Sequence, residues 1–256
     1  MIHPSAIIDS KAEIGDGCEI GPFCTIGPEV KLGKGCRLIS HVVVDGVTEI
    51  GDENVFYPFS SIGLQTQDLK WVGGLTRTLI GHRNTFRENV TVHSATSDGE
   101  CTLLGDDNHL LAYTHVAHNV EMGSRIIMSN VATLGGHVHV EDGAVIGGLA
   151  AVHQFCRIGK MSIIGGCSKV VQDVPPYFIA DGNPAVCRGV NKVGLERRGV
   201  DPEIQQAIKK VYRTLIREKL PLKEAVDRIR ADFGEIEMIR HFADFVDQTE
   251  RGICRP

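Results

Sequence analysis

Aliphatic or aromatic side chains recur at every sixth position along most of this sequence. The repeat runs through Ile8, Ile14, Ile20, Ile26, Leu32, Leu38, Val44, Ile50, Phe56 and Ile62, continues at Ile80, Phe86 and Val92, and resumes from Leu104 to Val170. A small residue often stands two positions earlier, as at Cys18, Cys24, Cys36 and Cys156, and glycine often follows one position later. Because alternate side chains of a strand point to opposite faces, residues two apart face the same side. The pattern predicts short strands separated by corners.

Three such units close one triangular coil of 18 residues, and stacked coils lie about 4.8 Å apart, the spacing of paired strands. The sequence therefore predicts a mainly β protein in which residues 1–183 form a parallel β-helix. Neither a helical period nor simple alternation fits this region as well. Residues 63–79 and 93–103 interrupt the repeat without changing its phase, so we expect two loops extruded from intact coils, where functional residues are often found.

The period changes after Pro175, Pro176 and Pro184, which cannot donate to a strand ladder. Residues 184–256 are expected to form a small helical C-terminal domain. Its first long helix, over 201–220, has Asp201 as N-cap and Pro202 at the first helical position. Amphipathic segments at 222–233 and 235–248 predict two more helices.

Composition narrows the class of protein. The chain has 29 Gly, only 5% aromatic residues and a net charge of −5. It contains no apolar run long enough to span a membrane and begins without a signal-like segment, so a cytoplasmic location is expected. Its eight Cys form no CxxC pair, and we expect free, mostly buried thiols. No basic patch with interleaved aromatic residues indicates nucleic-acid binding.

Histidines gather along one edge of the predicted prism. With 18 residues per coil, His118, His137 and His153 fall on one edge, with His115 adjacent and His93 at the mouth of the second loop. None of them occupies an inward position of the repeat. Imidazole is a suitable general acid or base near neutral pH, and it is also a common zinc ligand, so the pattern alone leaves both chemistries open.

Several motifs together resemble a known family. They are HVVVDG (41–46), QDLK (67–70), HVAH (115–118), GGHVHV (135–140), AVHQFC (151–156), QDVPPY (172–177) and GVNKVGLERRG (189–199). In this order, and with the hexapeptide repeat and the helical tail, the chain resembles the acyl-(acyl-carrier-protein)–UDP-N-acetylglucosamine O-acyltransferases over essentially its whole length. The resemblance implies a homotrimer of left-handed β-helices with active sites between subunits. It also implies transfer of an (R)-3-hydroxyacyl group from acyl carrier protein to the glucosamine 3-position of UDP-N-acetylglucosamine, the first step of lipid A biosynthesis, without a metal or another cofactor.

The resemblance also assigns roles to individual residues. His118 matches the general base, and the backbone N–H of Gly136 matches the candidate oxyanion donor. The expected substrate-binding residues are Asp68, Lys70, His93, His115, His137, His153, Gln154, Asn191, Arg197 and Arg198. Gly166 matches the position that limits acyl length, and a glycine there implies a longer chain.

One departure from the family concerns the base. Asn119 stands where many members have Asp, and an amide can orient the imidazole ring but supplies no charge. The acceptor is accordingly left open between UDP-N-acetylglucosamine and its 3-amino analogue. Residues 184–256 carry 15 Lys and Arg against 12 Asp and Glu, and this positive balance suits an acidic carrier protein.

Three other functions fit part of the sequence. A zinc lyase similar to the γ-class carbonic anhydrases shares the repeat, but this chain has HxxH where that family has a wider HxxxxH pair. An acetyl-CoA-dependent hexapeptide acetyltransferase does not explain the QDLK loop. A non-catalytic scaffold leaves the row of histidines unexplained.

Overall fold

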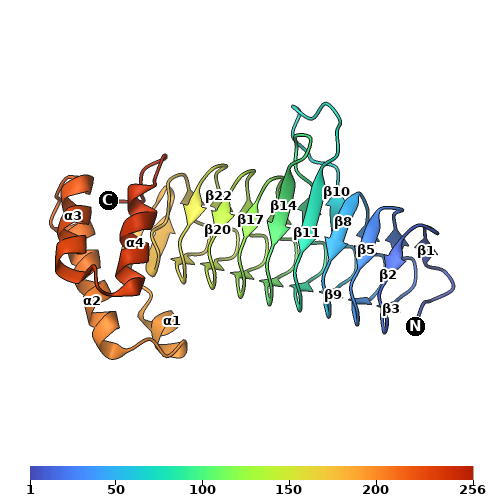
Figure 1. Cartoon of the computed structure of the whole chain (residues 1–256), viewed down its shortest axis with the longest axis horizontal. Coiled ribbons are helices and arrows are strands. Elements are labelled where there is room, and N and C mark those ends of the chain that lie inside the picture. Colours follow the sequence, from blue (N-terminus) through green and yellow to red (C-terminus); the bar gives the residue numbers. More distant parts are fainter. Residues whose placement is uncertain (256) are drawn as a thin grey trace.

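Short strands coil around one axis and form a three-sided prism in the computed structural model, which describes residues 1–255 (Figure 1). Sheet A consists of β3 (Glu19–Ile20), β6 (Arg37–Leu38), β9 (Val55–Phe56), β12 (Thr85–Phe86), β15 (His109–Leu110), β18 (Ile127–Met128), β21 (Val145–Ile146), β24 (Ile163–Ile164), β26 (Phe178–Gly182) and β27 (Ala185–Val190). Sheet B consists of β1 (Ile7–Ile8), β4 (Thr25–Ile26), β7 (Val43–Val44), β10 (Ser61–Leu64), β13 (Thr91–His93), β16 (His115–Val116), β19 (Thr133–Leu134), β22 (Ala151–Val152) and β25 (Lys169–Val170). Sheet C consists of β2 (Glu13–Ile14), β5 (Val30–Leu32), β8 (Val47–Ile50), β11 (Arg77–Ile80), β14 (Cys101–Leu104), β17 (Glu121–Met122), β20 (His139–Val140) and β23 (Arg157–Ile158).

The strand register follows the predicted 18-residue coil. His115 of β16 pairs in parallel with Thr133 of β19, and the same spacing recurs along all three sheets. The spacing widens where the two loops leave the prism, so that Ser61 pairs with Thr91 and Arg77 pairs with Cys101. The chain leaves β10 after Leu64 and returns at Arg77, then leaves β13 after His93 and returns at Cys101. Both excursions project from the same edge of the prism (Figure 1).

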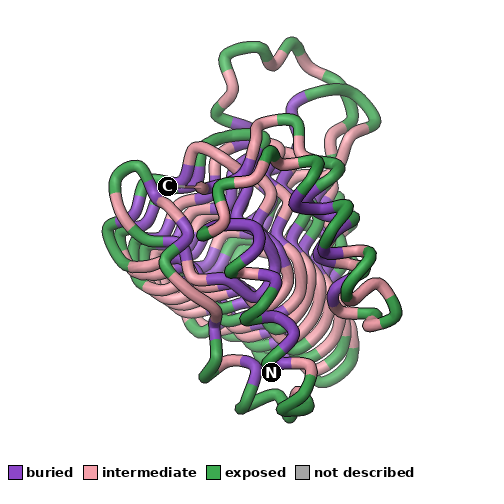
Figure 2. Tube along the Cα trace, turned by 90° about the vertical axis from the view of Figure 1, so that its left-hand side faces the viewer, coloured by how far each residue is buried: buried purple, intermediate pink, exposed green. Residues whose placement is uncertain are grey.

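The repeated aliphatic positions form the buried core, as predicted. Every one of them from Ile20 to Val170 is buried, whereas Ile8 and Ile14 in the first coil are half-buried. Buried stretches recur in successive coils along the prism (Figure 2). The inward cysteines are buried too, and burial raises the pKa of the Cys36 and Cys156 thiols to about 11. Thiols in that range are protonated near neutral pH, so these cysteines serve as packing residues.

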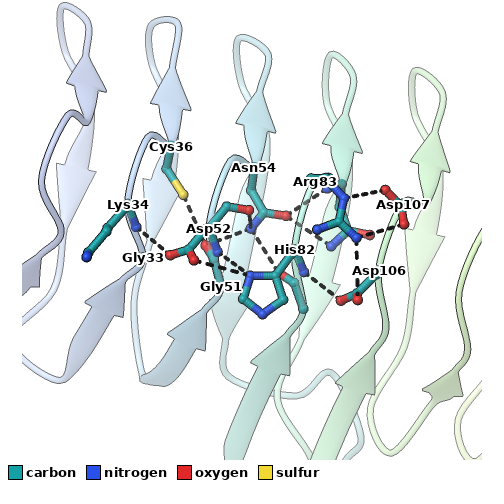
Figure 3. A network of polar contacts seen from close by, with 12 residues as sticks. Gly33, Lys34, Cys36, Gly51, Asp52, Asn54, His82, Arg83, Asp106 and Asp107 are labelled. Carbon is teal, nitrogen blue, oxygen red and sulfur yellow. Dashed lines mark hydrogen bonds and ion pairs between the residues drawn. The ribbon is translucent and has the colours of Figure 1, made fainter.

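Asparagine side chains bind successive coils together at the edge between sheets C and A. Asn54 Oδ1 accepts hydrogen bonds from the backbone N and from Nδ2 of Asn84, at 2.9 and 3.0 Å. Asn84 Oδ1 in turn accepts from the backbone N of Asn108 at 2.8 Å. Beside this ladder the backbone N of Asp52 donates to His82 Nδ1 (Figure 3). The polar groups at this edge therefore hydrogen-bond to one another across successive coils and have a structural role.

Helices pack against the last coils at one end of the prism (Figure 1). They are α1 (Lys192–Arg197), α2 (Pro202–Tyr212), a π-helical continuation η1 (Arg213–Arg217), α3 (Leu222–Phe233) and α4 (Glu237–Asp247). The Asp201 side chain accepts a hydrogen bond from the backbone N of Glu203 at 2.8 Å, which confirms it as the N-cap of α2. The predicted helices at 222–233 and 235–248 are confirmed as α3 and α4.

Polar and aromatic contacts hold this helical part in place. Phe178 of β26 lies 5.1 Å from the ring of Phe242 on α4. Arg157 of β23 donates to the carbonyl of Phe245 and lies over its ring at 4.0 Å. Strand β26 continues sheet A in parallel beside β24, and β27 then returns antiparallel to β26. Among residues 1–255, no helix is both long and apolar enough to cross a lipid bilayer.

Candidate active site

The candidate site lies along the edge between sheets B and C, which we call the histidine edge and define by the turns 117–120, 135–138 and 153–156. The 18-residue register stacks His118 beside Gly136 and Gln154 in successive coils, while Asn119 stacks with His137 and Phe155. These last three residues share a left-handed backbone, with φ of 58°, 57° and 64°. His118 and His137 therefore belong to adjacent columns of one edge.

His118 is held between two side chains. Its Nδ1 lies 2.9 Å from Asn119 Oδ1, and its Nε2 lies 3.7 Å from Asp68 Oδ2. Because an amide oxygen can only accept, Nδ1 carries the proton and Nε2 keeps a free lone pair in the neutral ring. The side chain is 13% exposed, so the imidazole is largely shielded from water.

Gly136 makes room for this imidazole. A Cβ atom built on Gly136 would lie 2.4 Å from both Cε1 and Nε2 of His118, so the ring lies directly against the glycine backbone. The carbonyl of Gly136 accepts from the backbone N of Phe155 at 3.1 Å. Its own N–H makes no hydrogen bond to any residue in the range 1–255. A free backbone donor therefore lies next to the candidate base.

The two loops bring Asp68 to the ring. Thr66 and Thr96, from different loops, have their hydroxyl oxygens 3.0 Å apart. The Thr66 hydroxyl accepts from the backbone N of Asp68, and Asp68 Oδ1 accepts from the backbone N of Lys70, each at 3.0 Å. These bonds fix the turn of the first loop so that the second carboxylate oxygen of Asp68 faces His118.

The neighbouring imidazoles are kept neutral. Burial, followed by repulsion from His93 and His118, lowers the pKa of His115 to about 4. Burial also lowers the pKa of His93 and of His137, each with a smaller contribution from His118. His93, His115 and His137 therefore carry no charge near pH 7.

Aromatic contacts and one hydroxyl orient these neighbours. The His93 and His115 rings meet edge to face at 5.2 Å, as do the His118 and His137 rings. His137 also stacks on Phe155 at 4.6 Å, and His115 Nδ1 lies 2.7 Å from the Thr91 hydroxyl. The rings are therefore packed as a cluster along the histidine edge.

Other predicted binding residues lie on the same edge but are open. His153 and Gln154 are exposed, and His153 Nδ1 donates to the carbonyl of Gln154 at 3.1 Å. Lys70 is exposed in the first loop, where its charge acts on His137. These three side chains are therefore open to solvent.

The remaining predicted residues lie away from His118 within one chain. Arg198 donates to the carbonyl of Gly143, in a turn between sheets C and A, and Arg197 is exposed beside it in α1. Asn191 is buried as the N-cap of α1, accepting from the backbone N of Gly194 and donating to the carbonyl of Met161. Gly166 is exposed in a turn between sheets A and B.

Four residues that touch the site escaped the sequence analysis: Thr91, Thr96, Glu100 and Phe155. Phe155 stands 18 residues after His137, so the coil spacing applied to every residue type would have identified it. Glu100 lies in the second loop, where the coil spacing predicts no neighbour. Thr96 had no such signal because it lies in a loop. Residues 1–255 hold no group of three His, Cys, Asp or Glu side chains placed to bind a metal ion.

Comparisons with known proteins match the chain from end to end. A curated relative from Thermodesulfovibrio yellowstonii, named acyl-(acyl-carrier-protein)–UDP-N-acetylglucosamine O-acyltransferase, is 49% identical over 255 residues, which cover 99% of both chains. A family profile described as "Udp N-acetylglucosamine O-acyltransferase; Domain 2" matches residues 173–254, and one described as "GMPPB C-terminal domain" matches residues 2–97.

Solved structures agree with this match. The UDP-N-acetylglucosamine acyltransferase of Francisella novicida superposes with a TM-score of 0.97 at 37% identity, covering 100% of this chain and 94% of its own. That of Bacteroides fragilis gives 0.96 at 35% identity, with 99% of each chain covered. The predicted fold, a left-handed parallel β-helix followed by helices, is confirmed.

Proposed function

The chain belongs to the acyl-(acyl-carrier-protein)–UDP-N-acetylglucosamine O-acyltransferase family, and we propose that it carries out this transfer with His118 as the general base. The single observation that carries the proposal is the imidazole of His118, whose Nε2 has a free lone pair facing Asp68 and the loops. The acyl group is an (R)-3-hydroxyacyl chain, and the reaction is the first step of lipid A biosynthesis, in the cytoplasm.

The proton path follows from the contacts of His118. Its Nε2 removes the proton of the glucosamine 3-hydroxyl as that oxygen forms a bond to the thioester carbonyl carbon. Asp68, 3.7 Å from Nε2, stabilises the imidazolium that results. When the tetrahedral intermediate collapses, the carbon–sulfur bond breaks and the imidazolium gives its proton to the departing thiolate of the carrier, which leaves as a thiol. No acyl-enzyme forms, and the proton count balances.

The charge that develops on the former carbonyl oxygen needs a donor. The backbone N–H of Gly136 is free within the described chain and lies beside His118. A fixed donor of this kind contributes most where water is excluded. In our proposal this N–H binds the oxyanion while His118 handles the proton.

A homotrimer explains the binding residues that lie apart. Gly166 and the pair Arg197 and Arg198 lie on the two edges that do not carry His118, and in our proposal a neighbouring subunit supplies them to the same cleft. Exposed apolar side chains form a row along the edge between sheets A and B, at Phe23, Phe59, Tyr113, Val131 and Leu149. Burying that row against a second chain would form the other wall of the site.

The arginines suit the diphosphate of the nucleotide because guanidinium groups bind phosphate oxygens in pairs. The side chain of Asn191 caps α1, so in our proposal Asn191 contributes to nucleotide binding through its backbone. Asp68, Lys70 and the neutral imidazoles of His93, His115 and His137 suit the sugar and the pantetheine arm, with His153 and Gln154 at the rim. Acyl carrier protein is the donor, and Gly166 leaves room for a long chain.

A direct assay tests the proposal. The purified protein is incubated with UDP-N-acetylglucosamine, or its 3-amino analogue, and a series of (R)-3-hydroxyacyl carrier proteins of increasing length, and the products are identified by mass. We expect a singly acylated sugar nucleotide from the wild-type protein. His118→Ala should form it about 10²-fold to 10⁴-fold more slowly. Absence of product at every length would overturn the activity, and near-normal turnover by His118→Ala would overturn the base.

A further inference from the structure

The amide of Asn119 joins His118 to a carboxylate that has no role in the proton path proposed above. Asn119 Nδ2 donates to Glu100 Oε2 at 2.7 Å, and its Oδ1 lies 2.9 Å from His118 Nδ1. Glu100 is the residue before β14, at the end of the second loop. The three side chains therefore form a continuous line from carboxylate to amide to imidazole.

Further hydrogen bonds fix the orientation of the amide. Asn119 Oδ1 also accepts from the backbone N of Thr96 at 3.1 Å, and the backbone N of Asn119 donates to the Thr102 hydroxyl at 2.8 Å. A flipped amide would set its oxygen against the Glu100 carboxylate and its NH₂ group against the N–H of Thr96. Both contacts would then be repulsive, so the oxygen faces His118 in the stable arrangement.

This orientation determines where the imidazole carries its proton. An oxygen at Nδ1 requires the Nδ1–H tautomer, which leaves Nε2 free to accept the substrate proton. An NH₂ group in the same place would favour a proton on Nε2 and block the base. The Glu100 carboxylate also polarises the amide, so that Asn119 Oδ1 becomes a stronger acceptor for the charged imidazolium.

We infer that Glu100 is a positioning residue for the acyl transfer: through Asn119 it fixes the Nδ1–H tautomer of His118 and stabilises the imidazolium by charge. The inference rests on the proposed function of His118. Glu100 does not touch the ring itself. Its carboxylate is held ionised, because the hydrogen bond from Asn119, ahead of those from Ser97, lowers its pKa.

The other charged and titratable groups around the His118 ring are few. Asp68 faces Nε2 from the first loop, and Lys70 on the same loop acts on His137. His93, His115 and His137 are neutral near pH 7, since burial lowers the pKa of each. Removing the charge of Glu100 therefore leaves Asp68 as the carboxylate that faces the ring.

An exchange of amide and carboxylate tests the relay. Glu100→Gln keeps an acceptor for Asn119 but removes the charge, and Asn119→Asp sets two carboxylates against each other. The double variant Glu100→Gln with Asn119→Asp restores one carboxylate and one amide in swapped order. For each, kcat, KM for UDP-N-acetylglucosamine and the pH dependence of kcat/KM are measured, with melting temperatures. Glu121→Gln is the matched control, since Glu121 contacts His139 and not Asn119.

We expect Glu100→Gln to lose kcat by on the order of tenfold, with KM little changed, because a less stabilised imidazolium makes a weaker base. Asn119→Asp should lose kcat for a different reason: its carboxylate repels Glu100, and the repulsion displaces the side chain that holds His118 Nδ1. The acid limb of the pH profile should move to lower pH in Glu100→Gln and return in the double variant, which should exceed both single variants in kcat. The control should behave as wild type.

Two results would overturn the inference. One is a Glu100→Gln variant whose kcat and pH profile match wild type, whatever its melting temperature. The other is a double variant no more active than the worse single one. His118→Ala is measured in parallel: if it is inactive while Glu100→Gln is normal, the relay alone fails, and if it stays active, the proposed base fails as well.

Discussion

Substituting Gly136 by alanine would test the close packing of backbone and base. The added methyl group would lie 2.4 Å from Cε1 and Nε2 of His118 and 3.1 Å from Cδ2. Normal contacts between such atoms are about 3.5 Å or longer, so the ring must move by about 1 Å. The φ of Gly136 lies outside the left-handed region, and alanine therefore suits the backbone itself.

The cost falls on catalysis more than on stability. Moving the ring breaks its hydrogen bond to Asn119 Oδ1, worth about 1 kcal/mol, and displaces Nε2 from the reacting oxygen. Loss of a positioned base lowers kcat by about 10²-fold to 10⁴-fold, which is about 3 to 5 kcal/mol in activation free energy. Stability should change by no more than about 1 kcal/mol, because alanine also restricts the unfolded chain.

The assay combines turnover with thermal melting. Initial rates of acyl transfer to UDP-N-acetylglucosamine are measured for wild type and Gly136→Ala, and unfolding is followed by circular dichroism. Gly189→Ala is the control, since a Cβ atom at Gly189 meets nothing within 4 Å. A Gly136→Ala enzyme with kcat within threefold of wild type would refute the reasoning, because it would show that His118 does not need this place against the glycine.

Three further outcomes are expected. Between pH 6.5 and about 4 the unfolded chain binds a proton at His115 that the folded chain excludes. Lowering the pH through this range should therefore reduce the unfolding free energy by up to about 3 kcal/mol. In His115→Gln, denaturant titrations should show a smaller decrease of the unfolding free energy over the same range. Gly166→Met should shorten the preferred acyl chain in the product mass spectrum, and an unchanged length would remove Gly166 from the acyl groove. Asn54→Ala should cost about 2 to 4 kcal/mol of unfolding free energy by leaving buried groups of Asn84 unpaired, with normal kcat at low temperature; an unchanged denaturation midpoint would contradict the structural role of the ladder.

The period of six determines most of the fold, because each inward position is filled by the same kind of side chain. Ile20 and Val170 lie at opposite ends of the repeat and are buried alike. The same arithmetic predicted the histidine edge. Handedness could not be derived this way, since an inward side chain is equally buried in a left-handed or a right-handed coil.

The candidate site was only partly predictable. The resemblance assigned the roles of His118 and Gly136, and spacing predicted the edge on which the histidines lie. The fold of the loops was not encoded in any period, so the approach of Asp68 to His118 and the bond from Thr96 to Asn119 needed the structure. Glu100 was missed because a single acidic residue in a loop has no pattern of its own until its partner is known.

The reversal of chain direction at β27 has a consequence for self-association. A stack of parallel coils can grow by adding another coil of the same direction, as a fibre does. Here β27 runs antiparallel to β26 at the end of sheet A, and the helices pack beyond it, so the last coil presents no parallel template to a second molecule. A variant shortened after residue 177 should therefore polymerise end to end. The hairpin of β26 and β27, with its helices, thus prevents the stack of coils from continuing into a second molecule.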